Sequence, residues 1–464
     1  MPDSLTVYSA WTREPVHELP YNTAADAEKY LKESVQLWRQ GPLPKYQRIE
    51  ILEKAAALIG ERAKTLAKQI ALEGGKPYAD ALVEAHRAAS SVKGAAETLS
   101  HSAGAEIPMG LTPSTEGYRA YTRIEPIGPV VAVSAFNHPL NLIAHQVAPA
   151  VAAGCPVVVK PASATPLSCL SFIDILREAG LPESWARPLL ISNEIATKVV
   201  TDPRVAFFTF IGSAKVGWSL RSKLAPGTRC ALEHGGSAPV IIAKDADMED
   251  AVSRLVKGGY YHAGQVCVSA QRLFVDKKVH KEFVNAFKSQ VEALKVDDPQ
   301  LEDTEVGPLI HPKEVERVHE WVEEAIESGA KCVTGGNILS ETAYAPTILD
   351  QPGPETKVSR EEVFGPVTAI YSYDSIEDAI ERANDVPWAF QAAVFTQNLK
   401  TAEFASGKLN AAAVMLNEHT AFRADWMPFA GWSASGHDTG GIPYTFHSMT
   451  REKLIITRNQ NQEK

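Results

Sequence analysis

Short, uniformly apolar runs alternate with helical patterns through most of the chain. Four of them follow one another between residues 130 and 210: "VVAVSAF", "VVV", "PLLI" and "VAFFTF". A second series follows residue 240, with "RLFV", "KCV", "TAIYSY", "AAVFT" and "AAAVML". Strands that are apolar on both faces are typical of parallel sheets covered by helices on both sides. The sequence therefore predicts an α/β fold with two doubly wound α/β domains that meet near residues 232–240.

A helical segment and a ribbon precede the first series of strands. Residues 23–100 are predicted to form helices, because Ile49, Leu52, Ala56 and Ile59 recur at three- and four-residue steps. The stretch "GYRAYTRIEPIG" alternates and is predicted to form a strand pair or ribbon that joins subunits or domains. The final "NQNQEK" is expected to be disordered.

The composition argues against several classes of protein. A formal net charge of -10 argues against a nucleic-acid partner, because nucleic-acid binders usually present a basic face. Five cysteines without C-x-x-C spacing predict neither a disulfide framework nor a metal site. The sequence contains no recognisable signal peptide or membrane span, so a cytoplasmic protein without a membrane partner is expected.

Glycines follow one of the apolar runs in "FFTFIGSAKVG". Gly212, Ser213 and Gly217 would let backbone amides at the start of a helix face a phosphate. A simple tight turn between a strand and a helix has the same appearance, so the motif alone leaves both interpretations open.

Two charged side chains end other predicted strands. Lys160 closes "VVVK" at the sheet edge where a nucleotide would lie, although a solvated strand-end lysine is the commoner case. Glu233 ends an apolar strand before Gly235 and Gly236, where a nearby cleft would raise its pKa and make it a general base. An ordinary strand-end glutamate with a basic partner is the alternative.

Cys267, in "HAGQVCV", is either a nucleophile or a small side chain that fills a core. A thiol paired with a carboxylate base such as Glu233 suits the formation and hydrolysis of a thioester. Asn137 offers an amide that can stabilise an oxyanion, or it is only a turn residue. Glu362, in "EEVFGPV", either accepts from a ribose hydroxyl or caps a loop.

Seven short motifs follow one another along the chain: "AFNHPLNL", "VVVKPASATP", "FTFIGSAKVG", "LEHGG", "GQVC", "EEVFGPV" and "MPFAGWSASG". In this order and spacing they resemble the aldehyde dehydrogenase superfamily, from about residue 20 to residue 458. The ending "SGHDTGGIPYTFHSMTREKLI", with "FRADWMPF", is most similar to the branch of lactaldehyde, phosphonoacetaldehyde and non-phosphorylating glyceraldehyde-3-phosphate enzymes.

The resemblance implies three structural parts. A Rossmann-like cofactor-binding domain would comprise residues 1–105 and 127–234, and a catalytic domain would comprise residues 235–449. Residues 106–126 and 450–464 would form a small β oligomerisation element. A homodimer or homotetramer is therefore expected.

The resemblance also implies roles for the site residues. Cys267 would be the nucleophile, Asn137 with the Cys267 backbone amide would form the oxyanion hole, and Glu233 would activate water. The residues expected to hold NADP or NAD are Lys160 and Glu362 at the riboses, Gly212, Ser213 and Gly217 at the pyrophosphate turn, and Phe364 beside the nicotinamide. The implied reaction oxidises an aldehyde to its carboxylic acid through a cysteine thiohemiacetal and a thioester.

Ser163 departs from the pattern of the family. NAD-preferring relatives often carry a glutamate three residues after the strand-end lysine, and that carboxylate would repel a 2′-phosphate. With Ser163 in this place and Lys160 nearby, NADP is expected to be accepted at least as well as NAD.

By register with the family, five residues are expected to line the aldehyde pocket: His138, Leu142, His145, Arg423 and Phe429. His145 follows His138 by seven residues, near two helical turns, so both are expected to face one tunnel. Such a pocket would be polar and partly cationic, and would favour small hydroxylated or anionic aldehydes. Alternatively, His145 and Arg423 contact only the backbone or neighbouring acidic residues.

Two other functions stay open. A CoA-acylating relative would pass the thioester to a thiol instead of water, but a water-activating Glu233 would waste that intermediate. A catalytically idle member of the superfamily would act as a binding protein, but Cys267, Glu233 and Asn137 together argue against it.

Overall fold

The first series of apolar runs forms a six-stranded sheet in the computed structural model, which describes residues 4–458. The strand order is β20-β9-β8-β5-β6-β7, and the sheet is parallel except for β20, which runs antiparallel to β9. Its strands are β5 (Val130–Val133), β6 (Val157–Lys160), β7 (Ala186–Pro188), β8 (Phe207–Ile211), β9 (Arg229–Glu233) and β20 (Gly436–His437).

Successive residues of these strands pack into two different cores. Val130 and Ala132 of β5 belong to a core shared with α2 to α6, whereas Val131 belongs to a core shared with α1 and α7. The helices around this sheet are α1 (Ala24–Gln40), α2 (Lys45–Glu61), α3 (Ala63–Gly74), α4 (Tyr78–His101), α5 (Asn141–Ala153), α6 (Pro166–Glu178), α7 (Asn193–Val200) and α8 (Ala214–Arg221). Because helices cover both faces, the doubly wound prediction is confirmed.

The second series forms a seven-stranded sheet in the order β12-β13-β14-β11-β10-β16-β17, with only β12 antiparallel to its neighbour. Ile241 of β10 faces a different core from Val240 and Ile242, so this sheet too is covered on both faces. Its strands are β10 (Ala238–Ile242), β11 (Ala270–Asp276), β12 (Lys331–Thr334), β13 (Thr347–Asp350), β14 (Val367–Tyr373), β16 (Gln391–Phe395) and β17 (Ala413–Leu416). Its helices are α9 (Met248–Tyr260), α10 (His280–Glu292), α11 (Pro312–Glu327), α12 (Lys357–Arg360), α13 (Ile376–Asn384) and α14 (Leu399–Lys408).

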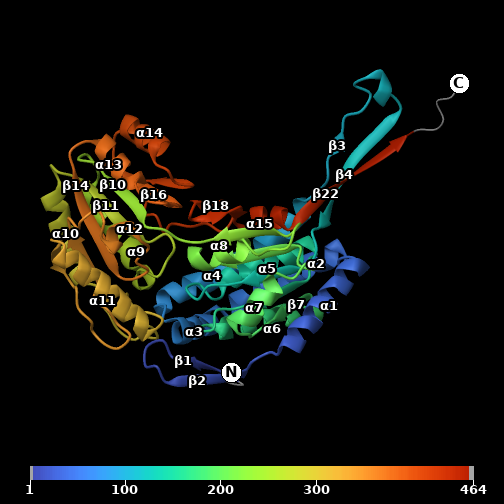
Figure 1. The fold of residues 1–464 in the computed structure, drawn as a ribbon, viewed down its shortest axis with the longest axis horizontal. Helices are drawn as coiled ribbons and strands as arrows, with labels where there is room; N and C mark the ends of the chain where they lie inside the picture. Colours follow the sequence, from blue (N-terminus) through green and yellow to red (C-terminus); the bar gives the residue numbers. More distant parts are fainter. Residues whose placement is uncertain (1–3, 459–464) are drawn as a thin grey trace.

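A three-stranded ribbon projects from the body of the molecule (Figure 1). It consists of β3 (Glu106–Ile107), β4 (Tyr118–Pro126) and β22 (Thr450–Arg458), with β22 antiparallel to β4. The ribbon thus joins the two segments predicted to form an oligomerisation element, and Leu454 and Ile456 of β22 are more than half exposed. Residues 459–464, which include "NQNQEK", lie outside the described residues.

The chain returns to the first sheet near its end. After the second sheet, β20 pairs with β9, and α15 (Ile442–Ser448) packs against α4 and α5. A boundary at residue 235 does not account for this return, and the division into domains stays a prediction.

The remaining elements are β1 (Ser4–Tyr8), β2 (Pro15–Pro20), β15 (Trp388–Ala389), β18 (Phe429–Ala430), β19 (Trp432–Ser433), β21 (Thr439–Gly440), η1 (Pro113–Thr115), η2 (Glu183–Trp185) and η3 (Tyr261–Gly264). No helix within residues 4–458 is long and apolar enough to span a membrane.

Candidate active site

A cavity of about 910 Å³ lies between the edges of the two sheets. Asn137, Gly212 and Glu233 line it from the carboxyl ends of β5, β8 and β9. Cys267 and Glu362 line it from the loops that precede β11 and β14. These loops lie at the amino ends of the strands of the second sheet. The sheets therefore contribute different ends of their strands to one site.

Most of the predicted site residues meet in this cavity. Those that line it are Asn137, His138, Leu142, His145, Gly212, Ser213, Glu233, Cys267, Glu362, Phe364, Arg423 and Phe429. Three do not line it: Lys160, Ser163 and Gly217. All five cysteines lie within residues 4–458, and among them only Cys267 lines the cavity. No group of three His, Cys, Asp or Glu side chains in the described part of the chain is arranged to hold a metal ion.

Lys160 and Ser163 lie beside the cavity. Lys160 is the buried last residue of β6, and among the described residues its ammonium reaches only the Pro161 carbonyl oxygen, at 3.5 Å. Burial lowers the pKa of Lys160. Ser163 is exposed in the following loop, and Ala162 between them lines the cavity. This loop thus forms part of the rim.

Gly217 packs behind the turn that is predicted to bind a phosphate. A Cβ atom on Gly217 would lie 2.1 Å from Cε1 of His234, so only glycine lets α8 pack this closely against the end of β9. His234 in turn donates from Nδ1 to the Gly212 carbonyl oxygen at 2.8 Å. The sequence did not reveal His234, which fixes the turn that was assigned to the pyrophosphate.

The thiol is presented by a strained turn. His262 and Ala263 have φ values of 49° and 53°, in the left-handed region that side chains other than glycine rarely adopt. Gly264 follows at φ 68°, and a Cβ there would lie 2.1 Å from the Gly365 carbonyl oxygen. Asn137 Nδ2 donates to the Gln265 carbonyl oxygen at 2.9 Å. That bond uses one amide hydrogen and leaves the other for an oxyanion.

Burial dominates the ionisation of the reactive groups. It raises the pKa of the Cys267 thiol; Glu362 and Glu233 act in the same direction, and Arg423 acts against them. Burial also raises the pKa of Glu233 to about 7, partly offset by Arg423. The thiol is thus protonated at neutral pH, and Glu233 ionises near neutrality, as a general base requires.

The two pocket histidines carry hydrogen bonds instead of charge. His138 Nε2 lies 3.0 Å from the Tyr261 hydroxyl, and His145 Nε2 lies 2.8 Å from Asp425 Oδ1. Burial lowers the pKa of both imidazoles, although Asp425 opposes the shift at each. The positive charge expected in the pocket therefore has to come from Arg423. His138 precedes α5 and His145 lies on it, and both line the same cavity.

Arg423 supplies the positive charge of the pocket. Its Nη1 donates to the Met427 carbonyl oxygen at 2.9 Å, and its guanidinium carbon lies 4.2 Å from the Phe429 ring centre. Nη2 is buried and has no hydrogen-bond partner among the described residues. Burial lowers the Arg423 pKa to about 10, so the group is still protonated at neutral pH. The alternative that Arg423 contacts only the backbone therefore applies to its Nη1 atom and not to Nη2.

A second arginine and its carboxylate partner lie beside Arg423. Arg87 of α4 donates to both oxygens of Asp425, from Nε at 3.1 Å and from Nη2 at 2.8 Å. Asp425 also accepts from Asn141 Nδ2 at 3.0 Å. Hydrogen bonds from His145 and Arg87 hold the pKa of Asp425 well below its usual range despite burial. Asp425 forms hydrogen bonds with Arg87, whereas Arg423 feels the charges of Glu233 and Asp425 without a hydrogen bond to either among the described residues.

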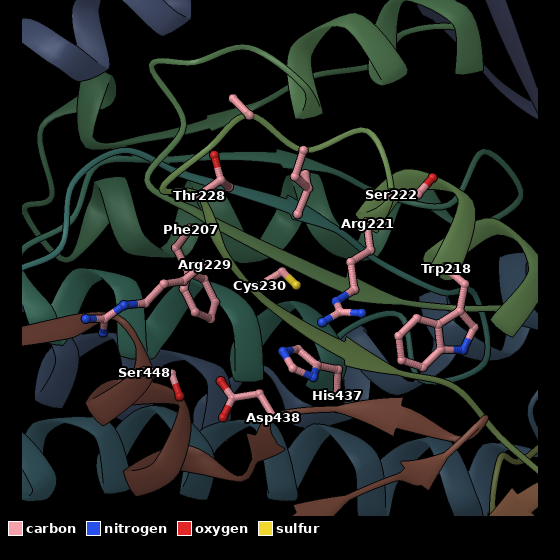
Figure 2. Close-up of a pocket in the computed structure, with 12 residues that line it drawn as sticks. Phe207, Trp218, Arg221, Ser222, Thr228, Arg229, Cys230, His437, Asp438 and Ser448 are labelled. Carbon is pink, nitrogen blue, oxygen red and sulfur yellow. The ribbon is translucent and has the colours of Figure 1, made fainter.

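A second cavity, of about 810 Å³, lies between α8, β9 and β20. Figure 2 shows Trp218, Arg221, Cys230 and His437 around it. It contains none of the predicted catalytic, cofactor or substrate residues. The chemistry predicted from the sequence therefore belongs to the cavity that contains Cys267.

Comparison with known proteins decides the family. The sequence pattern described as the aldehyde dehydrogenase family matches residues 2–455. The chain belongs to the aldehyde dehydrogenase family. The 3-sulfolactaldehyde dehydrogenase of Priestia megaterium is 37% identical over 455 residues, covering 98% of this chain and 95% of that relative.

Solved structures agree with this placement. Aldehyde dehydrogenase 21 of Physcomitrella patens, in complex with its reaction product succinate, has a TM-score of 0.95 at 34% identity, covering 99% of this chain and 96% of the other. The glyceraldehyde-3-phosphate dehydrogenase GapN of Methanocaldococcus jannaschii, complexed with NADP, has a TM-score of 0.94 at 32% identity, covering 99% and 100%. The branch indicated by the sequence is thus confirmed by its relatives.

Several residues in the cavity of this aldehyde dehydrogenase were not found from the sequence. They are Arg87, Lys215, His234, Tyr261, Arg317 and Trp321. Arg87 and Asp425 are 338 positions apart, so no local pattern links them. Asp425 stands two residues after Arg423 in "FRADWMPF", and that carboxylate was the available signal.

Proposed function

We propose that this aldehyde dehydrogenase oxidises a small anionic aldehyde to its carboxylic acid, with NADP or NAD as cofactor and Cys267 as nucleophile. The observation that carries the proposal is the buried Nη2 of Arg423, which has no hydrogen-bond partner within residues 4–458 and lies in the cavity that also holds Cys267 and Glu233. A guanidinium with free donors suits a carboxylate, sulfonate or phosphate group. The named relative acts on 3-sulfolactaldehyde, which carries such a group.

The cofactor end of the cavity fits a dinucleotide. Glu362 Oε1 is buried without a partner in the described part of the chain, and a Cβ on Gly235 would lie 1.6 Å from it. Ser134 Oγ, in the same cavity, is likewise buried and unpartnered within residues 4–458. Glu362 would hold a ribose hydroxyl, and Gly212 and Ser213 at the start of α8 would hold the pyrophosphate. NADP or NAD, when bound, supplies the acceptor for the hydride.

The first half of the reaction builds the thioester. The Cys267 thiol, which burial keeps protonated, loses its proton to solvent as its sulfur attacks the aldehyde carbon. The second amide hydrogen of Asn137 and the Cys267 backbone N–H stabilise the resulting oxyanion. When this oxyanion collapses to a carbonyl, a hydride leaves the same carbon, and the aldehyde has been oxidised to an acyl thioester.

The second half of the reaction hydrolyses the thioester. Glu233 takes a proton from water, the hydroxide attacks the acyl carbon, and the carbon–sulfur bond breaks. The products are a carboxylic acid and the free thiol. The raised pKa of Glu233, about 7, makes it strong enough as a base and still ionised near neutral pH.

The account of Arg423 predicts a loss that depends on substrate charge. Arg423→Gln is expected to lower kcat/KM for 3-sulfolactaldehyde by about 10- to 100-fold, the worth of a charged hydrogen bond. The same variant should change kcat/KM for a neutral aldehyde such as propanal by less than about threefold. Steady-state kinetics with both substrates measure the difference.

The matched control is Arg221→Gln, which removes an arginine from the other cavity. This variant should leave kcat/KM for both aldehydes unchanged. Equal losses of kcat/KM for charged and neutral aldehydes in Arg423→Gln would contradict the proposed anion site. Better turnover of octanal than of every polar aldehyde by the wild-type protein would also contradict it.

The cofactor preference is proposed to depend on Ser163. Ser163→Glu places a carboxylate in the exposed loop after Lys160, where it would repel the 2′-phosphate of NADP. We expect kcat/KM for NADP to fall by about 10-fold or more relative to that for NAD. Cofactor titrations at saturating aldehyde measure both values, with Ser163→Gln as the uncharged control. A strong preference of the wild-type protein for NAD would contradict this assignment.

The β ribbon is proposed to join subunits of a homodimer or homotetramer. Its support is the exposed apolar side chains of β4 and β22: Leu454 and Ile456, 52% and 56% exposed, share one face, and Tyr121, 44% exposed, lies on the other face beside Ile455. Exposed apolar side chains on a projecting ribbon are typical of interfaces.

A further inference from the structure

Two buried carboxylates lie behind the active site, outside its cavity. Glu73 on α3 and Glu84 on α4 are each 1% exposed, and neither lines the cavity that contains Cys267. Burial of a carboxylate is unfavourable unless hydrogen bonds or a charge compensate for the lost water. The hydrogen-bond and ion-pair partners of each carboxylate therefore show which segment of the chain that carboxylate holds in place.

Glu84 binds the start of α5. Its Oε1 accepts from the backbone amides of Leu140 and Asn141, at 2.9 and 3.1 Å. Its Oε2 pairs with the ammonium of Lys76, which is fully buried. A carboxylate at this position satisfies amides that have no partner within the helix and interacts favourably with the helix dipole. The seven-residue loop before α5, residues 134–140, contains Asn137.

Glu73 binds the start of α6 in the same way. Its Oε2 accepts from the Leu167 amide at 2.8 Å, and its Oε1 accepts from the Ser168 amide at 2.8 Å and from the Ser168 hydroxyl at 2.5 Å. Burial raises the pKa of Glu73 to about 7, and the bonds from Ser168 and Leu167 act against that shift. The loop before α6, residues 161–165, follows Lys160 and contains Ser163.

One short segment thus reaches both loops. Gly74 lies between Glu73 and Lys76, and a Cβ on it would lie 3.6 Å from Thr165 Cγ2 and 3.8 Å from the Phe136 carbonyl oxygen. The end of α3 therefore packs against the loop of Asn137 and against the loop of Ser163 at the same time. Each loop is fixed at one end by a strand and at the other by a capped helix.

We infer that Glu73 and Glu84 are positioning residues with separate roles, and this inference rests on the proposed function. Glu84, with Lys76, holds Asn137 in place and thereby controls the chemical step. Glu73 holds the loop from Lys160 to Thr165 and thereby controls the affinity for the cofactor. Neither carboxylate touches the reacting atoms, and each acts through the helix start that it binds.

The two variants that test this inference are each other's control. Glu73→Gln keeps one acceptor oxygen but replaces the other by an amide nitrogen that cannot accept from Leu167 or Ser168. Because Glu84→Gln alone would leave Lys76 buried without a counter-charge, the second variant combines Glu84→Gln with Lys76→Met. Two quantities are measured: the Kd for NADPH by fluorescence titration, and the rate of the first turnover at saturating NADP and aldehyde.

Opposite patterns are expected. Glu73→Gln should raise the Kd for NADPH about tenfold, the usual effect of a lost helix cap, and change the first-turnover rate less than about threefold. The Lys76→Met, Glu84→Gln variant should lower the first-turnover rate about 100-fold, as expected for a displaced oxyanion donor, with an unchanged Kd. Glu73→Asp, which keeps both acceptor oxygens, should retain part of the affinity for NADPH that Glu73→Gln loses.

The same data separate the possible failures. If both variants change Kd and rate together, or change neither, the two carboxylates have no separate duties and the inference is wrong. If the wild-type protein binds NADPH and oxidises the aldehyde, such a result leaves the proposed function intact. If the wild-type protein does neither, the proposed function fails and the inference fails with it.

Discussion

Cys267→Ala is expected to lower kcat/KM for aldehyde oxidation by at least about 10⁴-fold, because no thioester can form without the sulfur. The fold and the cofactor site should persist, since Cys267 is only partly buried and its methylene remains in alanine. NADPH fluorescence titration should therefore give a Kd within about twofold of wild type. Initial rates of NADPH formation measure the loss.

Two other cysteines provide matched controls. Cys230→Ala and Cys332→Ala remove thiols that do not line the cavity with Glu233 and Asn137. Both variants should keep wild-type rates. Full aldehyde oxidation by Cys267→Ala would overturn the nucleophile and, with it, the thioester mechanism.

Glu233→Gln is expected to separate the two halves of the reaction. The amide is of similar size but cannot take a proton from water, so hydrolysis of the thioester should slow by about 10²- to 10⁴-fold. NADPH formation should then show a rapid burst of about one equivalent per active site, followed by a slow steady rate. Stopped-flow absorbance measures both phases. A variant that loses the burst as well would show that Glu233 is needed for thioester formation too.

The pH dependence of the slow phase has a definite sign. Burial raises the pKa of Glu233 from its ordinary value of 4.5 to about 7, so the carboxylate is mostly protonated at pH 6 and mostly ionised at pH 8. The hydrolysis rate of the wild-type protein should therefore rise with pH, with a midpoint near 7, and this rise should vanish in Glu233→Gln. Asp438 also raises the Glu233 pKa, so Asp438→Asn should move the midpoint to lower pH. An unmoved midpoint would show that another group titrates.

The parallel sheets could be predicted because their sequence signal is local. A strand such as "VVV" before Lys160 is apolar at every position because successive side chains enter different cores, and both series show this texture. Other elements lacked such a signal. The β1–β2 hairpin buries Val7 and Leu19 in a small cluster, with Leu5 and Val16 packed against it, and the sequence did not distinguish β13 from the residues around it. The antiparallel direction of β12 also could not be read from "KCV".

The site was predictable where a motif places a side chain at a strand end. Glu233 and Lys160 end β9 and β6, and Asn137 and Gly212 follow β5 and β8 closely. The charge of the pocket was not predictable, because it depends on pairs formed across the fold. Asp425 neutralises Arg87 and bonds to His145, and burial keeps that imidazole uncharged. Residue type alone does not show whether a histidine is charged, because its environment decides its ionisation.

One measurement tests the central claim most directly. The Glu233→Gln protein is mixed with NADP and 3-sulfolactaldehyde, quenched in acid, and its intact mass and peptide masses are determined. The account predicts a mass increase equal to one acyl group, located on the peptide that contains Cys267 and absent without NADP. No adduct despite NADPH formation, or an adduct on another residue, would contradict catalysis through a Cys267 thioester.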